Sequence, residues 1–269
     1  MAAQPFLKWA GGKRWLTRRR QFFIPPYTGR YIEPFLGGGA VFFFHAPDSS
    51  LLADTNVSLI EVYQQLRDNW EAVWDRLCLH HRFHNKEHYY KERRLFRVKP
   101  TERAAQFLYL NRACWNGLYR VNQQGDFNVP IGTKTSIIFP DDDFQSISQS
   151  LSRSVILASD FEAVIDAASV GDFVFADPPY TVAHNNNGFL KYNEKIFSWD
   201  DQVRLRDACC RAVGRGATVY VTNAHHDAVI ELYRNCGDIE RLDRESVIGG
   251  SADYRGSVSE IGVLMRSIR

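Results

Sequence analysis

The most restrictive feature of this sequence is a series of short strand-like runs, the last three of which alternate with helix-like segments. The strand candidates are Tyr31–Glu33, Leu51–Ala53, Ser154–Ala158, Phe173–Ala176 and Thr218–Thr222. Phe161–Ala168 and Asp200–Val213 are helix candidates between the last three strands. Strands that alternate with helices favour a parallel sheet with crossover helices. The sequence therefore predicts an α/β fold.

The stretch from about residue 56 to 148 has a different character. Aromatic and basic residues dominate it, and the strand signal fades. We therefore predict one α/β domain built from residues 1–55 and 149–269, interrupted by a mostly helical insertion at 56–148.

Several protein classes are excluded by the sequence. The longest apolar run, Ala40–Phe44, is far shorter than the roughly 20 residues of a membrane-spanning helix. No signal peptide is visible, and none of the five cysteines forms a CxxC pair. We therefore expect a reduced, cytoplasmic protein that is not associated with a membrane. The sequence leaves the oligomeric state open, and a monomer is compatible with it.

Basic residues are concentrated in two segments, although the net charge of the whole chain is only +2. Residues 1–30 contain seven Lys/Arg and no acidic residue, and residues 76–120 contain eleven Lys/Arg against three Glu. Such segments are typical of a surface that binds a polyanion such as nucleic acid. A solvated surface with acidic neighbours in the fold is the alternative.

A glycine-rich turn follows the first predicted strand. In Glu33–Gly39 the last three residues are glycines, which allow a ligand to approach the backbone closely. Asp54 follows the next strand, where an acidic residue is well placed to bind ribose hydroxyls. The spacing is neither GxGxxG nor GxxxxGK[ST], which disfavours a dinucleotide or a nucleoside triphosphate.

A second motif, Asp177-Pro178-Pro179-Tyr180, directly follows the strand candidate Phe173–Ala176. The two prolines stiffen the loop at the sheet edge where α/β proteins bind ligands. Asp177 and the Pro178 carbonyl can accept hydrogen bonds from one amino group, and Tyr180 offers a flat face to a base. The motif therefore predicts a site that activates an exocyclic amine.

The run Leu108–Gly132 combines arginines, amides and aromatic residues. Arg112 and Arg120 occur there with Trp115 and Tyr119 among several Asn and Gln. Arginine and amide side chains read base edges, and aromatic rings stack on bases. The run is a candidate for sequence recognition; a polar helix-loop with core aromatics is the alternative.

The histidines give no clear metal motif. His80, His84 and His88 have i, i+4 spacing, which can hold a metal on a helix, but HExxH is absent. We therefore predict no metal site and interpret these residues as solvated or DNA-facing.

Together these motifs resemble the Dam-type, or D12 class, DNA adenine-N6 methyltransferases over nearly the whole chain. The resemblance begins at Phe6–Lys13, includes the motifs above and extends to Phe197–Gln202, which resembles the start of a helix after the catalytic loop. It implies a Rossmann-like, S-adenosylmethionine-dependent methyltransferase sheet with a helical target-recognition insertion. It further implies an adenine-specific enzyme of the EC 2.1.1.72 type, encoded by a bacterium or phage, that acts on double-stranded DNA without a metal and recognises GATC.

The resemblance also implies roles for individual residues. The catalytic loop is Asp177, Pro178, Pro179 and Tyr180. The S-adenosylmethionine pocket comprises Trp9, Lys13, Phe35, Gly37, Gly39, Asp54, Asp160, Phe161 and Asp177. The DNA contacts are Lys8, Trp115, Asn116, Leu118, Arg120 and Pro130. Lys8 and Arg120 match guanine contacts, Leu118 and Pro130 match thymine contacts, and Trp115-Asn116 match the pair that wedges into the duplex.

Two positions depart from the family pattern: Trp115 replaces a tyrosine, and Lys134 stands where an aromatic residue is expected. Two alternatives stay open. An RNA or protein-side-chain methyltransferase could share the Pro-Pro-Tyr loop, although Asn at position 177 would favour it. A non-catalytic DNA-binding regulator could keep the basic surface, although loss of Asp177 or of the glycines would favour it.

Overall fold

The computed structural model describes residues 3–19, 22–122, 124–180, 197–245 and 257–267. The chain forms two compact units from separated stretches of sequence. Unit 1 comprises Met1–Ile24, Gly37–Asp48 and Asn56–Ala158, and unit 2 comprises Pro25–Leu36, Ser49–Thr55 and Ser159–Arg269. The insertion at 56–148 lies wholly within unit 1.

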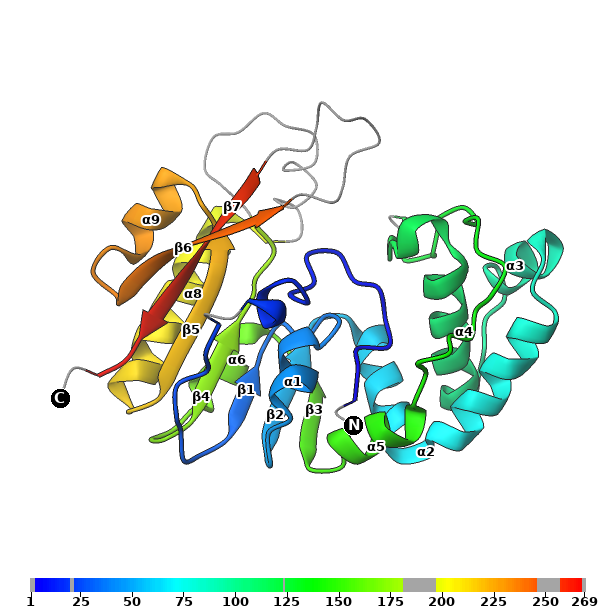
Figure 1. The fold of residues 1–269 in the computed structure, drawn as a ribbon, viewed down its shortest axis with the longest axis horizontal. Helices are drawn as coiled ribbons and strands as arrows, with labels where there is room; N and C mark the ends of the chain where they lie inside the picture. The colour runs from blue at the N-terminus through cyan, green and yellow to red at the C-terminus, as the bar shows by residue number, and fades with distance from the viewer. Residues whose placement is uncertain (1–2, 20–21, 123, 181–196, 246–256, 268–269) are drawn as a thin grey trace. The chain divides into compact units, whose positions relative to one another are not determined.

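The predicted α/β fold is confirmed by a seven-stranded sheet in the order β3-β2-β1-β4-β5-β7-β6 (Figure 1). Four of its strands run parallel in unit 2: β1 (Tyr31–Glu33), β2 (Ser50–Asp54), β4 (Phe173–Ala176) and β5 (Thr218–Ala224). All four residues of β4 are buried, as expected for an apolar run in the middle of a parallel sheet. Strand β5 continues two residues beyond the predicted end, to Ala224.

Two antiparallel strands complete the sheet of unit 2 and were not predicted. Strand β7 (Ser257–Met265) lies between β5 and β6 (Asp238–Glu245), so that Val263 is opposite both Val221 and Ile239. Six of the eight residues of β6 are charged, which hides its strand character in the sequence. Charged residues are common on an edge strand because they prevent pairing with other chains.

Helices α6 (Phe161–Asp166), α8 (Trp199–Gly214) and α9 (Asp227–Tyr233) belong to unit 2. Helix α8 begins at a capping box in which Ser198 and Asp201 bond to each other's backbone N–H. The apolar faces of these helices pack with the sheet in one buried core.

Unit 1 is mainly helical, which confirms the predicted character of residues 56–148. Its elements are the 3₁₀ turns η1 (Leu16–Arg18) and η2 (Trp115–Gly117), the helices α1 (Ala40–His45), α2 (Val57–Arg82), α3 (Lys86–Glu92), α4 (Pro100–Ala113) and α5 (Phe144–Leu151), and the strand β3 (Ser154–Ala158). Asn56 caps α2 by accepting a hydrogen bond from Leu59 N at 3.0 Å. Helices α2 and α4 pack side by side (Figure 1). Among the described residues, no helix has the length and apolar character needed to cross a membrane.

Candidate functional site

The Asp177–Tyr180 loop lies at the carboxyl end of β4, as predicted. Asp177 Oδ1 accepts a hydrogen bond from Thr222 Oγ1 at 2.7 Å. Thr222 is fully buried in the neighbouring strand β5. A hydroxyl fixed in a central strand orients the carboxylate more firmly than a loop alone would.

Tyr180 is anchored by a residue from the end of the sequence. Its hydroxyl donates to Glu260 Oε2 at 2.5 Å, and Glu260 is buried on β7 opposite Ala224. Burial, together with the negative charges of Asp177 and Glu260, raises the pKa of Tyr180 well above its usual range. The phenol therefore remains a neutral hydrogen-bond donor at physiological pH.

A buried amide pair supports the loop from α8. Gln202 Nε2 donates to the Pro179 carbonyl at 3.5 Å, and its Oε1 accepts from Asn223 Nδ2 at 2.8 Å. Gln202 and Asn223 are completely buried. Gln202 belongs to the helix start that the sequence singled out, and its contact with Pro179 gives that helix start a structural role.

Aromatic residues of unit 2 gather where Phe35 follows β1 and Phe161 begins α6. The rings of Phe35 and Phe161 are stacked with centroids 5.3 Å apart, and the Arg204 guanidinium lies 4.7 Å from the Phe161 ring centroid. Asp160 Oδ1 accepts from Glu162 N at 2.9 Å, which caps α6, and from Arg204 Nη2 at 2.7 Å. Asp54 ends β2, and its carbonyl accepts from Ser159 N at 3.2 Å. The structure thus brings four predicted cofactor residues of unit 2 to neighbouring strand ends.

The glycine-rich turn of unit 1 accommodates an indole ring. Gly37 has a φ of +45°, and a Cβ there would lie 2.7 Å from Cδ1 of Trp9. Gly39 has a φ of +62°, and a Cβ there would lie 2.8 Å from the Tyr63 hydroxyl. Larger residues at these positions would displace Trp9 or Tyr63, so the glycines leave the room that these two rings occupy.

Lys8 and Trp9 are attached to the recognition run. Asn111 accepts from Lys8 N at 3.2 Å and donates to Lys8 O at 2.9 Å and to Gly117 O at 3.2 Å. The Trp9 ring stacks on Tyr119 at 5.4 Å. Lys13 is buried, and its Nζ donates to the Gly11 carbonyl at 3.0 Å. The buried side chain of Asn111 therefore connects Lys8, a predicted DNA contact, with the 3₁₀ turn η2 at Gly117.

The predicted DNA contacts share one property, which is exposure to solvent. The exposed residues are Lys8, Trp115, Asn116, Leu118, Arg120 and Pro130. Trp115 N donates to the Pro130 carbonyl at 2.9 Å, and Asn128 N donates to the Arg120 carbonyl at 3.1 Å. The exposed Arg120 side chain also donates from Nε to Asn128 Oδ1 at 2.8 Å. Backbone bonds therefore hold this surface together while its side chains remain accessible.

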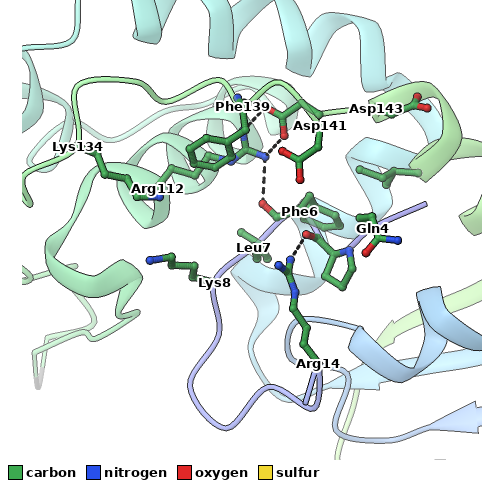
Figure 2. A pocket seen from close by; sticks show the side chains of 13 residues that line it. Gln4, Phe6, Leu7, Lys8, Arg14, Arg112, Lys134, Phe139, Asp141 and Asp143 are labelled. Carbon is green, nitrogen blue, oxygen red and sulfur yellow. Dashed lines mark hydrogen bonds and ion pairs between the residues drawn. The ribbon is translucent and has the colours of Figure 1, made fainter. Parts of the chain in front are cut away.

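Arg112 does not belong to this surface, although the sequence grouped it with Arg120. It is 3% exposed and forms a two-pronged ion pair with Asp142 at 2.6 and 2.7 Å. It also donates to the Ile137 and Phe6 carbonyls and lies 4.7 Å from the Phe139 ring centroid (Figure 2). Arg112 is therefore not available to contact bases, because these partners hold it inside unit 1.

Lys134, where an aromatic residue was expected, lines a cavity of about 120 Å³ in unit 1 together with Lys8, Arg14 and Asp141 (Figure 2). Its ammonium lies 4.3 Å from the Phe139 ring centroid. Burial and the charges of Lys8 and Arg112 lower the pKa of Lys134.

Sequence reasoning missed Thr222, Asn223 and Glu260 as partners of the catalytic loop. Glu260 had one usable signal, because it is an acidic residue that directly precedes the apolar run Ile261–Met265. The remainder of the C-terminal segment that could not be placed from the sequence, residues 249–256, lies outside the described residues.

The sheet and its strand-end residues define the S-adenosylmethionine-dependent methyltransferase fold. Residues 9–247 match the model of the D12 class N6 adenine-specific DNA methyltransferases, and the chain belongs to this family. Its reaction is therefore methylation of adenine N6 in DNA, and the family implies S-adenosylmethionine as the methyl donor.

Known relatives agree with this assignment. The chain is 37% identical to the Type II methyltransferase M1.LlaDCHI of Lactococcus lactis subsp. cremoris, over 96% of this chain and 94% of that protein. It is also 37% identical to the DNA N-6-adenine-methyltransferase of Escherichia phage P1, over 96% of this chain but 35% of that protein. The DNA adenine methylase of Haemophilus influenzae is 30% identical, over 96% of this chain and 92% of that protein.

Proposed function

We propose that this chain is an adenine-specific methyltransferase of the EC 2.1.1.72 type that modifies GATC in double-stranded DNA and flips the target adenine out of the helix. The main observation in support of this proposal is that all six predicted DNA contacts are exposed. In contrast, the Asp177–Tyr180 loop is held in place by three buried side chains, those of Thr222, Gln202 and Glu260. We propose residues 1–55 and 149–269 as the catalytic domain and 56–148 as the recognition domain of a cytoplasmic enzyme.

The residues at the strand ends suit S-adenosylmethionine, which supplies the methyl group when bound. Gly37 allows close approach to the backbone beside Trp9, where a Cβ would collide with the indole. Asp54 at the end of β2 is placed to accept hydrogen bonds from ribose hydroxyls. We assign the remaining cofactor contacts to Lys13, Phe35, Gly39, Asp160, Phe161 and Asp177.

Asp177 and the Pro178 carbonyl would accept hydrogen bonds from the N6 amino group. This reduces conjugation of the nitrogen lone pair with the ring and aligns it with the methyl carbon. The bound donor would supply a methyl group from its sulfonium to the lone pair that Asp177 and Pro178 orient, and the amino group would release one proton to solvent. Positioning and electrostatic stabilisation supply most of the rate enhancement, and the step needs no metal.

Tyr180 would offer its ring to the flipped adenine while Glu260 holds its hydroxyl. Flipping costs a few kcal/mol for unpairing and unstacking. Trp115 is 51% exposed and is available to fill the space that the adenine leaves. Stacking on these two rings would offset part of the cost.

The proposed GATC specificity assigns guanine contacts to Lys8 and Arg120. A guanidinium can donate two hydrogen bonds to guanine O6 and N7, a pair of acceptors that other bases lack. Leu118 and Pro130 would make apolar contacts with thymine methyl groups. Asn116 would accompany Trp115 in the wedge, and its left-handed φ of 56° turns the backbone sharply at that point.

The test uses radiolabelled S-adenosylmethionine and duplexes that differ at each base of GATC, with RNA and protein substrates as controls. We expect label only in N6-methyladenine and only in duplexes that contain GATC. Labelling of another sequence would refute the proposed specificity, and labelling of RNA or protein would support the alternative methyltransferase. DNA binding without label would support the non-catalytic regulator.

A further inference from the structure

Two histidines and one glutamate outside the catalytic and recognition residues meet inside unit 1. His80 lies near the end of α2, and His88 and Glu92 are four residues apart on α3. One ligand atom from each side chain lies within 4.8 Å of the others. Because i and i+4 positions share one face of a helix, α3 presents His88 and Glu92 together toward His80.

The spacing of the two imidazoles suits a metal ion. His80 Nδ1 and His88 Nε2 are 3.1 Å apart. Two nitrogen ligands of tetrahedral zinc, each about 2.0–2.1 Å from the ion, are about 3.3 Å apart. A hydrogen bond between the rings also accounts for this distance, but it does not account for a Glu92 carboxylate oxygen within 4.8 Å of both nitrogens.

The surroundings hold the ligand atoms in a fixed geometry. His80 and Glu92 are buried, and the His80 ring stacks on Tyr109 with centroids 4.8 Å apart. A stacked, buried ring keeps its nitrogen aimed at the same point, which is what a metal site requires of its ligands.

Arg97 pairs with the Glu92 carboxylate, and this ion pair leaves acceptor sites for a cation. Its Nη2 donates to Glu92 Oε1 and Oε2, both at 2.7 Å. A carboxylate has about four acceptor sites, so one oxygen can bind a metal while it accepts from Arg97. Hydrogen bonds of this kind commonly orient carboxylates that ligate metals.

We propose that His80, His88 and Glu92 bind one zinc-like divalent cation that fastens α3 to α2. This site differs from our sequence-based expectation of no metal, because the histidine pattern alone does not reveal the burial of Glu92 beside both rings. The role is structural and independent of methyl transfer. Helix α3 has only seven residues, and helices this short need tertiary anchors to be stable.

The first test measures zinc binding to the full-length protein after dialysis against a chelator, in competition with a chromogenic zinc indicator. We expect one equivalent to bind and to raise the melting temperature, because a ligand that binds only the folded state stabilises it. His88→Gln should weaken binding by more than about tenfold, the lower range for disturbing even an outer partner of a metal site. His81→Gln is the matched control. His81 follows His80 on α2, but its Nδ1 accepts a hydrogen bond from Ile137 N at 3.4 Å and is not one of the three proposed ligands.

The second test uses cobalt(II), whose visible spectrum reports its coordination. We expect the ligand-field bands of a four-coordinate site in the wild-type protein and their loss in His88→Gln. If this variant does not fold by far-UV circular dichroism, the wild-type spectrum still decides. Absence of these bands, absence of stoichiometric zinc binding, or equal losses in His81→Gln and His88→Gln would overturn the proposal.

Discussion

The Asp177–Tyr180 loop of unit 2 and the Trp115–Pro130 segment of unit 1 are stabilised in opposite ways. Buried side chains from β5, α8 and β7 hold the first through Thr222, Gln202 and Glu260. The second is held mainly by backbone bonds, and the side chains assigned to DNA remain exposed. Groups that act on one reacting atom need fixed geometry, whereas groups that read a duplex need access to it.

The largest effect should follow from Asp177→Ala. This change removes the hydrogen-bond acceptor assigned to the reacting amino group, and an interaction realised mainly in the transition state affects turnover more than affinity. We expect turnover to fall by at least about 10³-fold, with DNA binding near wild type. Single-turnover assays and fluorescence titration would measure both. More than a tenth of wild-type turnover would rule out the catalytic role.

Arg112→Ala should affect stability instead of base recognition. It leaves Asp142 buried without its partner, which typically costs about 3–5 kcal/mol. Thermal or urea unfolding, followed by tryptophan fluorescence, would measure the loss. Under conditions where the variant is folded, its preference among GATC variants should be that of the wild type. A variant as stable as the wild type would contradict the structural role of Arg112.

Arg120→Ala, only eight positions further along the chain, should leave stability near wild type and alter specificity. A two-pronged contact with guanine contributes about 1–3 kcal/mol, so discrimination should relax by about 5- to 150-fold at one base pair. Methylation rates on GATC and on each single-base variant would show this. Uniform slowing on all duplexes would indicate a phosphate contact and would remove Arg120 from base readout.

The smallest effect should come from Glu260→Gln. The amide keeps the size of the side chain but removes the charge that helps to raise the pKa of Tyr180, so that pKa should fall. Because Glu260 positions Tyr180, we expect kcat to fall about tenfold, which is about 1.4 kcal/mol, with little change in KM. Spectrophotometric tyrosine titration and steady-state kinetics would test both. An unchanged titration would show that the hydrogen bond does not affect the phenol.

The sequence predicts the α/β fold and the place of the Asp177–Tyr180 loop at the end of β4, but not the partners of that loop. The local sequence predicts both Phe173–Ala176 and Asp177–Tyr180. A short apolar run favours a buried strand, and the two prolines that follow end the strand in a stiff loop. Thr222 and Glu260 reach the loop because β5 pairs with β4 and β7 pairs with β5. The order of strands in a sheet is set by long-range contacts, which the local sequence pattern does not show.

The contrast between Arg112 and Arg120 could not be predicted for a different reason. Every residue from Leu108 to Ala113 is buried on α4. This part of the helix has no solvent-exposed face, so its sequence shows no amphipathic pattern. Periodicity therefore could not separate a buried arginine from an exposed one. Ion pairing with Asp142, 30 positions away, makes the difference.

The position of β7 has a consequence for biosynthesis. A ribosome makes β5 and β6 before β7, yet β7 is the strand that lies between them. While residues 257–265 are still inside the exit tunnel, β5 has an open edge that can pair with other strands. Glu260 arrives with the same strand, so a nascent chain acquires the anchor of Tyr180 in the step that closes this edge.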